Sequence, residues 1–406
     1  MLSSKTIATI KSTVPALEVH GTEITKLFYN MLFTHNPELL NIFNHANQKQ
    51  ERQQQALANA VYAAAKNIDQ LEAILPVVKQ VAHKHRSLGV KPEHYPIVGK
   101  YLLLAIKEVL GDDATDDILN AWEETYSVIA GVFIEVEQEM YTEAATQPGG
   151  WENERNFVVD RKVKESDVIT SFYLVPSDGK AIAPFKSGQY ISVTVDIPND
   201  DFTHIRQYSL SDAPGKPYYR ISVKKETNPS KPDGVVSNYL HEHIDAGDRL
   251  KITAPAGDFY LKDDSSPVVL LSGGVGITPM LSMLKSSLNQ NRKTTFIHAA
   301  LNGKVHAFHD EIIGLDHPSL DYYVCYETPT NKDREDGLFN REGYIEKDWL
   351  DETLPMDPDT HYYFCGPLPF MRAIKESLTK LGVKEEKIHF EFFGPAVALE
   401  PAESQK

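Results

Sequence analysis

The 406-residue sequence has only two cysteines, Cys325 and Cys365, too few for a disulfide framework. It contains no apolar run as long as a membrane span, and its first residues, MLSSKTIATIKSTVP, lack the apolar block of a signal peptide. Positive charge is scarce as well: 41 Lys and Arg face 57 Asp and Glu, and the net charge of -16 repels phosphate. We therefore expect a cytoplasmic protein with reduced thiols that binds no nucleic acid and does not span a membrane.

The chain is too long for one ordinary core, so two or three domains are expected. The first part is helical, Pro148 and the glycines after it break any helix, and short β-rich runs follow. From about Pro267, apolar strands alternate with helix-like segments, which is typical of a parallel α/β sheet. The predicted divisions are a helical domain (1–142), a linker (143–151), a strand-rich domain (152–264), an α/β domain (265–397) and a mobile tail (398–406).

One histidine lies on the buried side of a predicted helix over residues 72–88. Its apolar stripe holds Ile74, Val78, Val81, Ala82, His85 and Leu88. His83 instead falls on the solvent face with Lys79, Gln80 and Arg86. Gly89 should end this helix, and Pro92 should open the next, with His94 and Tyr95 in its first turn. A zinc site of two histidines is excluded because His83 and His85 point apart. The pattern alone leaves His85 as either a hydrogen-bonded core histidine or a ligand.

The neighbours of His85 favour a ligand. The helical domain resembles a globin over its whole length, through the stretch FYNMLFTHNPELLNIFN and the residues that follow it. The resemblance implies that His85 is the proximal haem ligand and that Phe43 packs on the haem. Gln53 and Leu57 share one helical face, and Tyr29 shares a face with apolar neighbours that should turn its hydroxyl inward.

A carboxylate in the last helix of this domain is a further candidate. Glu135 lies on an apolar stripe with Ala121, Val128 and Val132, where an unpaired charge is costly. It either reaches solvent or caps a turn, or it accepts a hydrogen bond from His85 and makes that ligand more basic. A Tyr–His–Glu proximal set is found in the flavohaemoglobin subgroup, and Tyr95 and Glu135 match its positions. We therefore predict haem iron on His85, with Tyr95 and Glu135 behind it.

The strand-rich domain carries a different set of motifs. In order, HIRQYSLSDAP, YRISVKKE, DGVVSNYL and AGDRLKITAPAGDF resemble the antiparallel FAD barrel of the ferredoxin-reductase type. The resemblance implies that Arg206 binds the pyrophosphate, Tyr208 lies against the isoalloxazine ring and Ser209 bonds its polar edge. Gln207 and Tyr190 complete the predicted FAD set. Sheet packing is the alternative for the two tyrosines.

The α/β domain opens with a glycine-rich turn in VVLLSGGVGITPML. The predicted NAD(P)-binding residues are Gly273, Gly274, Val275, Gly276, Ile277 and Thr278. A glycine turn before a helix lets backbone approach a pyrophosphate, although the third glycine of the dinucleotide fingerprint is missing. The turn nevertheless has the place of the reductase family's nicotinamide lobe.

The end of this domain resembles the same family. In HFEFFGP, the resemblance implies that Phe392, Phe393, Gly394 and Pro395 cover the flavin. Glu391 and Lys84 match positions at a haem–flavin junction.

The resemblance extends over about the whole chain and implies a flavohaemoglobin acting as a nitric oxide dioxygenase with haem b, FAD and NADH or NADPH. We expect a monomer that acts on oxygen and nitric oxide, and NADH as donor because HAALNGK offers no arginine cluster for a 2′-phosphate. The alternatives are a haem or flavin reductase, an alkyl hydroperoxide reductase and an oxygen-binding sensor globin.

Overall fold

The computed structural model describes residues 2–43, 51–227, 233–355 and 357–394. They fall into two compact units. The first comprises the described parts of Met1–Asn153, Thr194–Arg206 and Gly394–Ala396, and the second comprises the rest. Within the described residues, no helix is long and apolar enough to cross a membrane. Pro395 and the predicted mobile tail lie outside the described residues.

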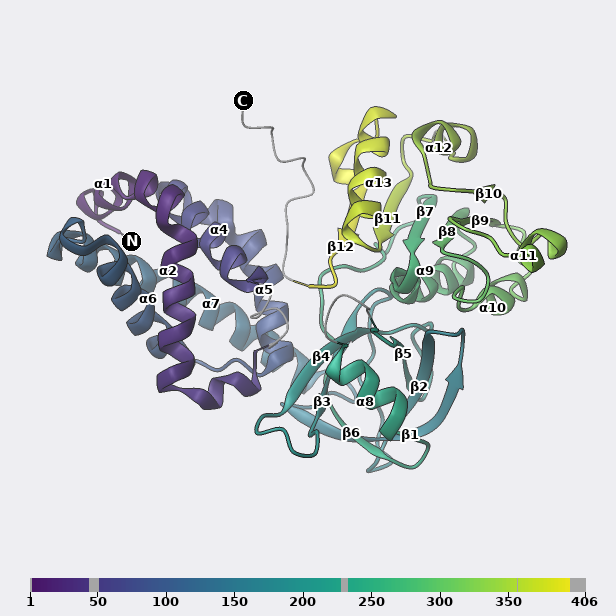
Figure 1. The fold of residues 1–406 in the computed structure, drawn as a ribbon, viewed down its shortest axis with the longest axis horizontal. Coiled ribbons are helices and arrows are strands. Elements are labelled where there is room, and N and C mark those ends of the chain that lie inside the picture. The colour runs from purple at the N-terminus through teal and green to yellow at the C-terminus, as the bar shows by residue number, and fades with distance from the viewer. Residues whose placement is uncertain (1, 44–50, 228–232, 356, 395–406) are drawn as a thin grey trace. The chain divides into compact units, whose positions relative to one another are not determined.

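The N-terminal domain is all helical, as predicted (Figure 1). Its helices are α1 (Ser4–Ser12), α2 (Val14–His35), η1 (Pro37–Asn41), α4 (Arg52–Lys66), η2 (Ile68–Ile74), α5 (Leu75–Leu88), α6 (His94–Leu110), η3 (Gly111–Asp113) and α7 (Asp116–Thr146). Their apolar faces meet in one core that includes Ile24, Phe28, Leu32 and Ile106.

Helix α7 is the element that supports the other helices around the site. Thr115 caps its start by accepting from Ile118 N, and Asp116 and Asp117 suit the positive end of the helix dipole. The helix continues to Thr146, past the predicted domain end at 142, and stops before Pro148. Along its 31 residues it contacts α1, α5 and α6.

The strand-rich domain is an antiparallel sheet that closes on itself, which confirms the predicted barrel. Its strands are β1 (Glu154–Lys164), β2 (Ile169–Pro176), β3 (Tyr190–Val195), β4 (His204–Ser209), β5 (Tyr219–Lys224) and β6 (Arg249–Thr253), in the order β4-β3-β6-β1-β2-β5. An antiparallel bridge from Leu210 to Ile221 joins the two outer strands. Helix α8 (Val235–His243) follows β5.

The last domain is a parallel sheet with helices on both faces, as predicted. Its strands are β7 (Val268–Gly273), β8 (Thr294–Ala300), β9 (Leu320–Tyr326), β10 (Arg341–Glu342), β11 (His361–Cys365) and β12 (Ile388–Glu391), in the order β10-β9-β8-β7-β11-β12. Its helices are α9 (Ile277–Asn289), α10 (His309–Ile313), α11 (Asn331–Asp336), α12 (Lys347–Thr353) and α13 (Leu368–Lys380), with the short η4 (Gly274–Gly276) and η5 (Glu385–Lys387).

Alternate side chains of β7 point to opposite faces of this sheet. Val268 and Leu270 pack in the core that contains α9, whereas Val269 and Leu271 pack in the core that contains α12 and α13. The strand order changes direction between β7 and β11. Open α/β sheets bind ligands beside the carboxyl ends of strands at such a point. The glycine turn after β7 therefore stands where a ligand is expected.

Candidate functional site

His85 lies in the last turn of α5, with the buried residues Val78 and Ala82 on the same stripe. The helix ends at Leu88, and Gly89 follows with φ +77°, a left-handed conformation that suits glycine. The predicted helix end is therefore confirmed. The His85 side chain is 32% exposed, and its Nδ1 lies 2.7 Å from Glu137 Oε1.

Tyr95 reaches the same carboxylate from the first turn of α6. Its hydroxyl donates to Glu137 Oε1 at 2.6 Å and lies 3.2 Å from His85 Nδ1. Burial, followed by the hydrogen bond to Glu137, raises the pKa of Tyr95 well above its ordinary value. Tyr95 therefore stays a neutral donor across the physiological range.

The prediction that Glu135 is the carboxylate behind His85 is wrong. Glu135 is exposed, whereas Glu137 is 3% exposed and makes both hydrogen bonds. Two residues along a helix are about 200° apart, so the two side chains leave α7 on opposite sides. The buried line in this part of α7 runs through Ala130, Glu137 and Ala144 at intervals of seven. That spacing was the signal in the sequence that could have found Glu137.

Glu137 settles which His85 nitrogen is available to a metal. A carboxylate only accepts, so the proton shared at 2.7 Å belongs to His85 Nδ1, and Nε2 keeps its lone pair. In the part of the chain that is described, no group of three or more His, Cys, Asp and Glu could hold a metal ion. A single imidazole with a carboxylate behind it fits iron that arrives in a haem and needs one protein ligand.

A stripe of α7 supports this arrangement at intervals of four. The Phe133 ring lies 5.7 Å from the His85 ring and 6.2 Å from the Tyr95 ring. Tyr141, four residues after Glu137, donates to Val90 O at 2.8 Å just beyond the end of α5. One face of α7 thus packs on the histidine, bonds it and fixes the end of its helix.

The predicted solvent face of α5 is only partly correct. Arg86, predicted to be exposed, is 6% exposed, and His83 is half-buried. The cause is α7, whose Tyr141 lies over the last turn of α5 with its hydroxyl 3.4 Å from Arg86 O. A pattern within α5 cannot show that a second helix covers its polar side.

On the distal side, the structure brings Tyr29 and Gln53 together. Tyr29 on α2 is 6% exposed, and its hydroxyl is hydrogen-bonded to the Gln53 side chain of α4. Burial raises the pKa of Tyr29, although the bond with Gln53 acts in the opposite direction. The Phe43 ring packs edge-on against Tyr29 at 5.9 Å, and half-buried Leu57 packs into the same core.

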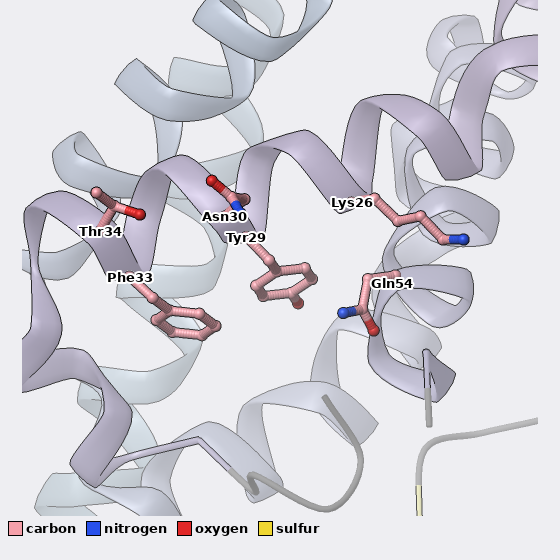
Figure 2. A pocket seen from close by; sticks show the side chains of 6 residues that line it. All are labelled: Lys26, Tyr29, Asn30, Phe33, Thr34 and Gln54. Carbon is pink, nitrogen blue, oxygen red and sulfur yellow. The ribbon is translucent and has the colours of Figure 1, made fainter. Parts of the chain in front are cut away.

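An open pocket of about 390 Å³ is lined in part by Tyr29. Figure 2 shows Tyr29 and Phe33 projecting from α2, with Gln54 of α4 across from Tyr29. Two residues here were not among those predicted: Gln54, which is 9% exposed, and Thr25, whose hydroxyl donates to Gln54 O at 2.9 Å. Thr25 thereby holds the first turn of α4 against α2, and that turn carries Gln53.

The predicted FAD residues lie on two strands of the barrel. Arg206, Gln207, Tyr208 and Ser209 end β4, and Tyr190 opens β3. Arg206 donates to Ile205 O at 2.8 Å, and Ser209 is buried. A Cβ on Gly257 would meet the Tyr190 ring at 3.0 Å, so that ring lies directly over the glycine. All five residues lie on β3 or β4, and their contacts with FAD remain a prediction.

The glycine turn between β7 and α9 has two kinds of glycine. A Cβ on Gly276 would meet Cys365 O at 2.1 Å, so only glycine lets the turn approach the end of β11. Gly274 has φ +54° and open space above it, as a backbone cradle for phosphate requires. Half-buried Val275 and buried Ile277 pack inward, and the Thr278 hydroxyl donates to Val275 O at 3.0 Å.

The C-terminal motif follows β12. Phe392 is half-buried, Phe393 is 48% exposed and Gly394 has φ +155°. Glu391 ends β12 in register with Cys365, and Lys84 Nζ donates to Gly394 O at 3.3 Å inside the first unit. Pro395 falls outside the described residues.

Family comparisons agree with this division. A family model described as "Globin" matches residues 26–133, and one described as "Oxidoreductase NAD-binding domain" matches residues 270–376. Curated relatives named Flavohemoprotein include that of Bacillus thuringiensis subsp. konkukian, 60% identical over 98% of this chain and 100% of its own. The one from Rhizobium meliloti is 46% identical, again over 98% of this chain and 100% of its own.

Two solved structures are similar as well. The flavohemoglobin from Malassezia yamatoensis, described with bound FAD and heme, has a TM-score of 0.84 at 28% identity and covers 97% of this chain and 100% of that one. The FAD/NAD-binding domain of a nitric oxide dioxygenase from Vibrio cholerae has a TM-score of 0.55 at 40% identity, over 59% of this chain and 99% of that one.

Proposed function

Because this chain belongs to the flavohaemoprotein family, we propose that it is a nitric oxide dioxygenase that forms nitrate from nitric oxide and oxygen with electrons from NAD(P)H. The chain is an oxidoreductase that joins a globin domain to an NAD-binding domain. The dioxygenase named in the Vibrio cholerae structure supports the finer assignment for the second part of the chain. Two buried free thiols, Cys325 and Cys365, support a reducing, cytoplasmic location.

Haem b and FAD are the cofactors of this proposal, with NADH as the preferred donor. When bound, FAD accepts an electron pair from NADH and supplies single electrons to the haem iron, where oxygen and nitric oxide react. His85 Nε2 would hold the haem iron, and Phe43 and Leu57 would contact the haem. Tyr190, Arg206, Gln207, Tyr208 and Ser209 would hold FAD, and the turn Gly273–Thr278 would hold the nicotinamide dinucleotide.

On the proximal side, Glu137 holds the His85 Nδ1 proton and so makes Nε2 a stronger donor. Tyr95 donates to the same carboxylate oxygen and keeps it directed at the imidazole. A globin that only carries oxygen does not require a buried carboxylate at this position. This charge-assisted bond to His85 is the observation that carries the proposal.

On the distal side, Tyr29 supplies a neutral hydroxyl in a buried setting. A hydroxyl fixed in place can donate to an oxygen atom that gains negative charge during reaction. The hydrogen bond with Gln53 orients that hydroxyl, and Thr25 fixes the turn that carries Gln53. Together these residues favour oxygen activation over simple storage.

Two alternatives use the same cofactors. A haem or flavin reductase, or an alkyl hydroperoxide reductase, would need the glycine turn and the barrel but not the distal pair. A sensor globin would need no continuous supply of electrons, so the NAD-binding domain on the same chain argues against it.

The deciding experiment is steady-state turnover of the purified holoenzyme with NADH and oxygen. Nitric oxide, cumene hydroperoxide and ferric citrate are offered in turn, and nitrate is quantified. We expect one nitrate for each nitric oxide consumed, at a rate far above the rates with the other acceptors. NADH oxidation that is fastest with cumene hydroperoxide and forms no nitrate would refute the proposal and favour an alkyl hydroperoxide reductase.

A further inference from the structure

Helix α9 presents a polar face to the barrel inside the second unit. Three polar residues share one side of this helix, because Lys285 and Ser286 lie three and four residues after Ser282. Ser282 donates to Asp212 O at 2.7 Å, and Lys285 Nζ donates to Asp212 Oδ1 at 2.6 Å. Ser286 is hydrogen-bonded to Ser187 of the barrel at 2.5 Å. The helix that follows the glycine turn is thus bonded to the barrel along its length.

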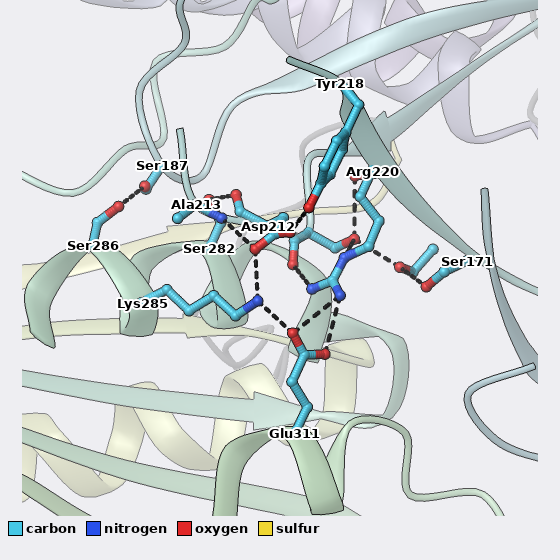
Figure 3. Close-up of polar contacts among 12 residues, drawn as sticks. Ser171, Ser187, Asp212, Ala213, Tyr218, Arg220, Ser282, Lys285, Ser286 and Glu311 are labelled. Atoms are coloured by element: carbon cyan, nitrogen blue, oxygen red, sulfur yellow. Dashed lines mark hydrogen bonds and ion pairs between the residues drawn. The ribbon is translucent and has the colours of Figure 1, made fainter. Parts of the chain in front are cut away.

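A set of four charges lies at the centre of this contact, and we call Asp212, Arg220, Lys285 and Glu311 the seam network. Figure 3 shows Lys285 reaching both Asp212 and Glu311, and Arg220 meeting Glu311 from the other side. Arg220 NH1 lies 3.0 and 3.1 Å from the two Glu311 oxygens. Two cations and two anions alternate, so each charge has opposite charges as neighbours.

The seam network is buried on the barrel side. Arg220 is 3% exposed, and it also donates to Tyr173 OH at 3.3 Å and to Ser211 Oγ at 3.2 Å. Burial by itself would raise the pKa of Asp212, but Arg220 and Lys285 outweigh it and the pKa lies below its ordinary value. Buried ion pairs add little net stability because desolvation is costly, whereas their geometry is strict. Such a network is better suited to fixing an orientation than to strengthening a contact.

The rest of the same contact is less directional. Met280, Met283 and Leu284 of α9 pack in one core with Ile169 and Phe259 of the barrel. Methionine and leucine side chains tolerate small shifts between the surfaces that they join. An open pocket of about 510 Å³ is lined by all four network residues, so side-chain packing is incomplete on that side of α9. The seam network supplies the restraint that this packing lacks.

We propose that the seam network is a positioning device that holds α9, and with it the glycine turn, in register with the barrel for electron transfer from nicotinamide to flavin. The proposal rests on the NADH-oxidising part of the proposed function and not on the nitric oxide step. Hydride leaves reduced nicotinamide for the flavin, and one solvent proton completes flavin reduction. None of the four residues is among those predicted to bind FAD or NAD(P), and they act through α9. Transfer requires the reacting atoms about 3–3.5 Å apart, and a 1 Å misplacement can cost about 10²-fold.

The test is anaerobic stopped-flow reduction of the flavin by NADH in the full-length holoenzyme. Lys285→Met removes one charge of the network while keeping an unbranched side chain. We expect the limiting rate of flavin reduction to fall by about 10- to 100-fold. FAD content should stay at the parent's value, and the apparent Kd for NADH should change by less than about threefold. Lys285→Arg retains the charge and should recover most of the rate.

Two further variants make the test decisive. Glu311→Gln keeps the size of its side chain and gives a second reading if Lys285→Met does not fold. Lys380→Met removes an exposed lysine that is paired with Glu376 on α13, and it should behave like the parent. Parent-like rates in both network variants would overturn the proposal. Equal slowing in Lys380→Met, or no recovery in Lys285→Arg, would overturn it as well.

Hydrogen–deuterium exchange supplies a readout that does not depend on turnover. Loss of the restraint should speed exchange in peptides that cover residues 274–289 of Lys285→Met, and exchange in α13 should stay unchanged. Unchanged exchange in residues 274–289 would contradict the proposed role. Neither measurement uses nitric oxide, so a protein that reduces its flavin normally but forms no nitrate would refute the proposed function and leave this proposal standing.

Discussion

The proximal and distal sides of the candidate haem site are restrained in different ways. On the proximal side, His85 and Tyr95, on two helices, converge on one oxygen of Glu137, a buried carboxylate on a third. On the distal side, Tyr29 is bonded to Gln53 and lines an open pocket of about 390 Å³. The two sides therefore differ in how tightly their residues are held. Several hydrogen bonds fix the residues around His85, whereas Tyr29 borders an open pocket.

The largest expected effect comes from removing the proximal ligand. His85→Ala should abolish haem binding because its Nε2 is the nitrogen left for iron. His83→Ala should keep its haem because the Glu137–Tyr95 pair faces His85 and not His83. The haem-to-protein ratio, from the Soret band of each purified variant, is the measurement. Equal haem content in the two variants would refute the assignment of His85.

A smaller but still large effect is expected on the distal side. Tyr29→Phe keeps the ring packing and removes the donor hydroxyl. A lost donor in a buried site is worth roughly 2.7–4 kcal/mol in a transition state, so nitric oxide turnover should fall by about 10²–10³-fold. Oxygen should also dissociate faster from the reduced protein, which stopped-flow spectroscopy measures. A parental oxygen off-rate would mean that the Tyr29 hydroxyl does not face the iron.

Removing the proximal charge should cost less than removing the distal donor. Glu137→Gln keeps an oxygen for His85 Nδ1 but loses the negative charge, and turnover should fall by about 10- to 100-fold. Glu135→Gln is the matched control, because Glu135 is exposed two residues away. Steady-state nitrate formation by the two variants is compared. If Glu135→Gln were the slower enzyme, the carboxylate predicted from the sequence would be correct after all.

The smallest effect is expected where α7 fixes the end of α5. Tyr141→Phe removes the hydroxyl that donates to Val90 O and should cost about 1 kcal/mol of stability. For a domain of this size, the melting temperature should fall by about 2–4 °C. Calorimetry of the holoprotein measures the shift, and haem content should be unchanged. Loss of haem instead would assign Tyr141 a direct role in holding His85.

These side chains also show which parts of the site could be predicted from the sequence. The position of His85 on a buried helix face was predictable from an apolar stripe and a glycine stop, whereas its role as a haem ligand was expected only from the resemblance to globins. Glu137 was missed because two carboxylates lie two residues apart on α7, and the apolar stripe through Ala121, Val128 and Val132 favoured Glu135. The order of helices and strands along the chain was predictable from local patterns, and α7 ends at Thr146, just before the predicted helix break at Pro148.

Contacts between elements distant in the sequence could not be predicted. Each charge of the seam network is unremarkable in its own segment, and Lys285 meets Asp212 only because the barrel and α9 pack together. The same holds for Thr25, whose partner is a backbone carbonyl of α4. The partners of Lys285 and Thr25 lie on other elements, so the pattern within α9 or α2 does not reveal them.

The central claim is that a buried carboxylate at position 137 hydrogen-bonds the iron ligand. Resonance Raman spectroscopy of the iron–histidine stretch in the reduced holoprotein tests it most directly, because a more anionic imidazole binds iron through a stiffer bond. We predict that Glu137→Gln lowers this frequency while Glu135→Gln leaves it at the parental value. A parental frequency in Glu137→Gln would contradict the account.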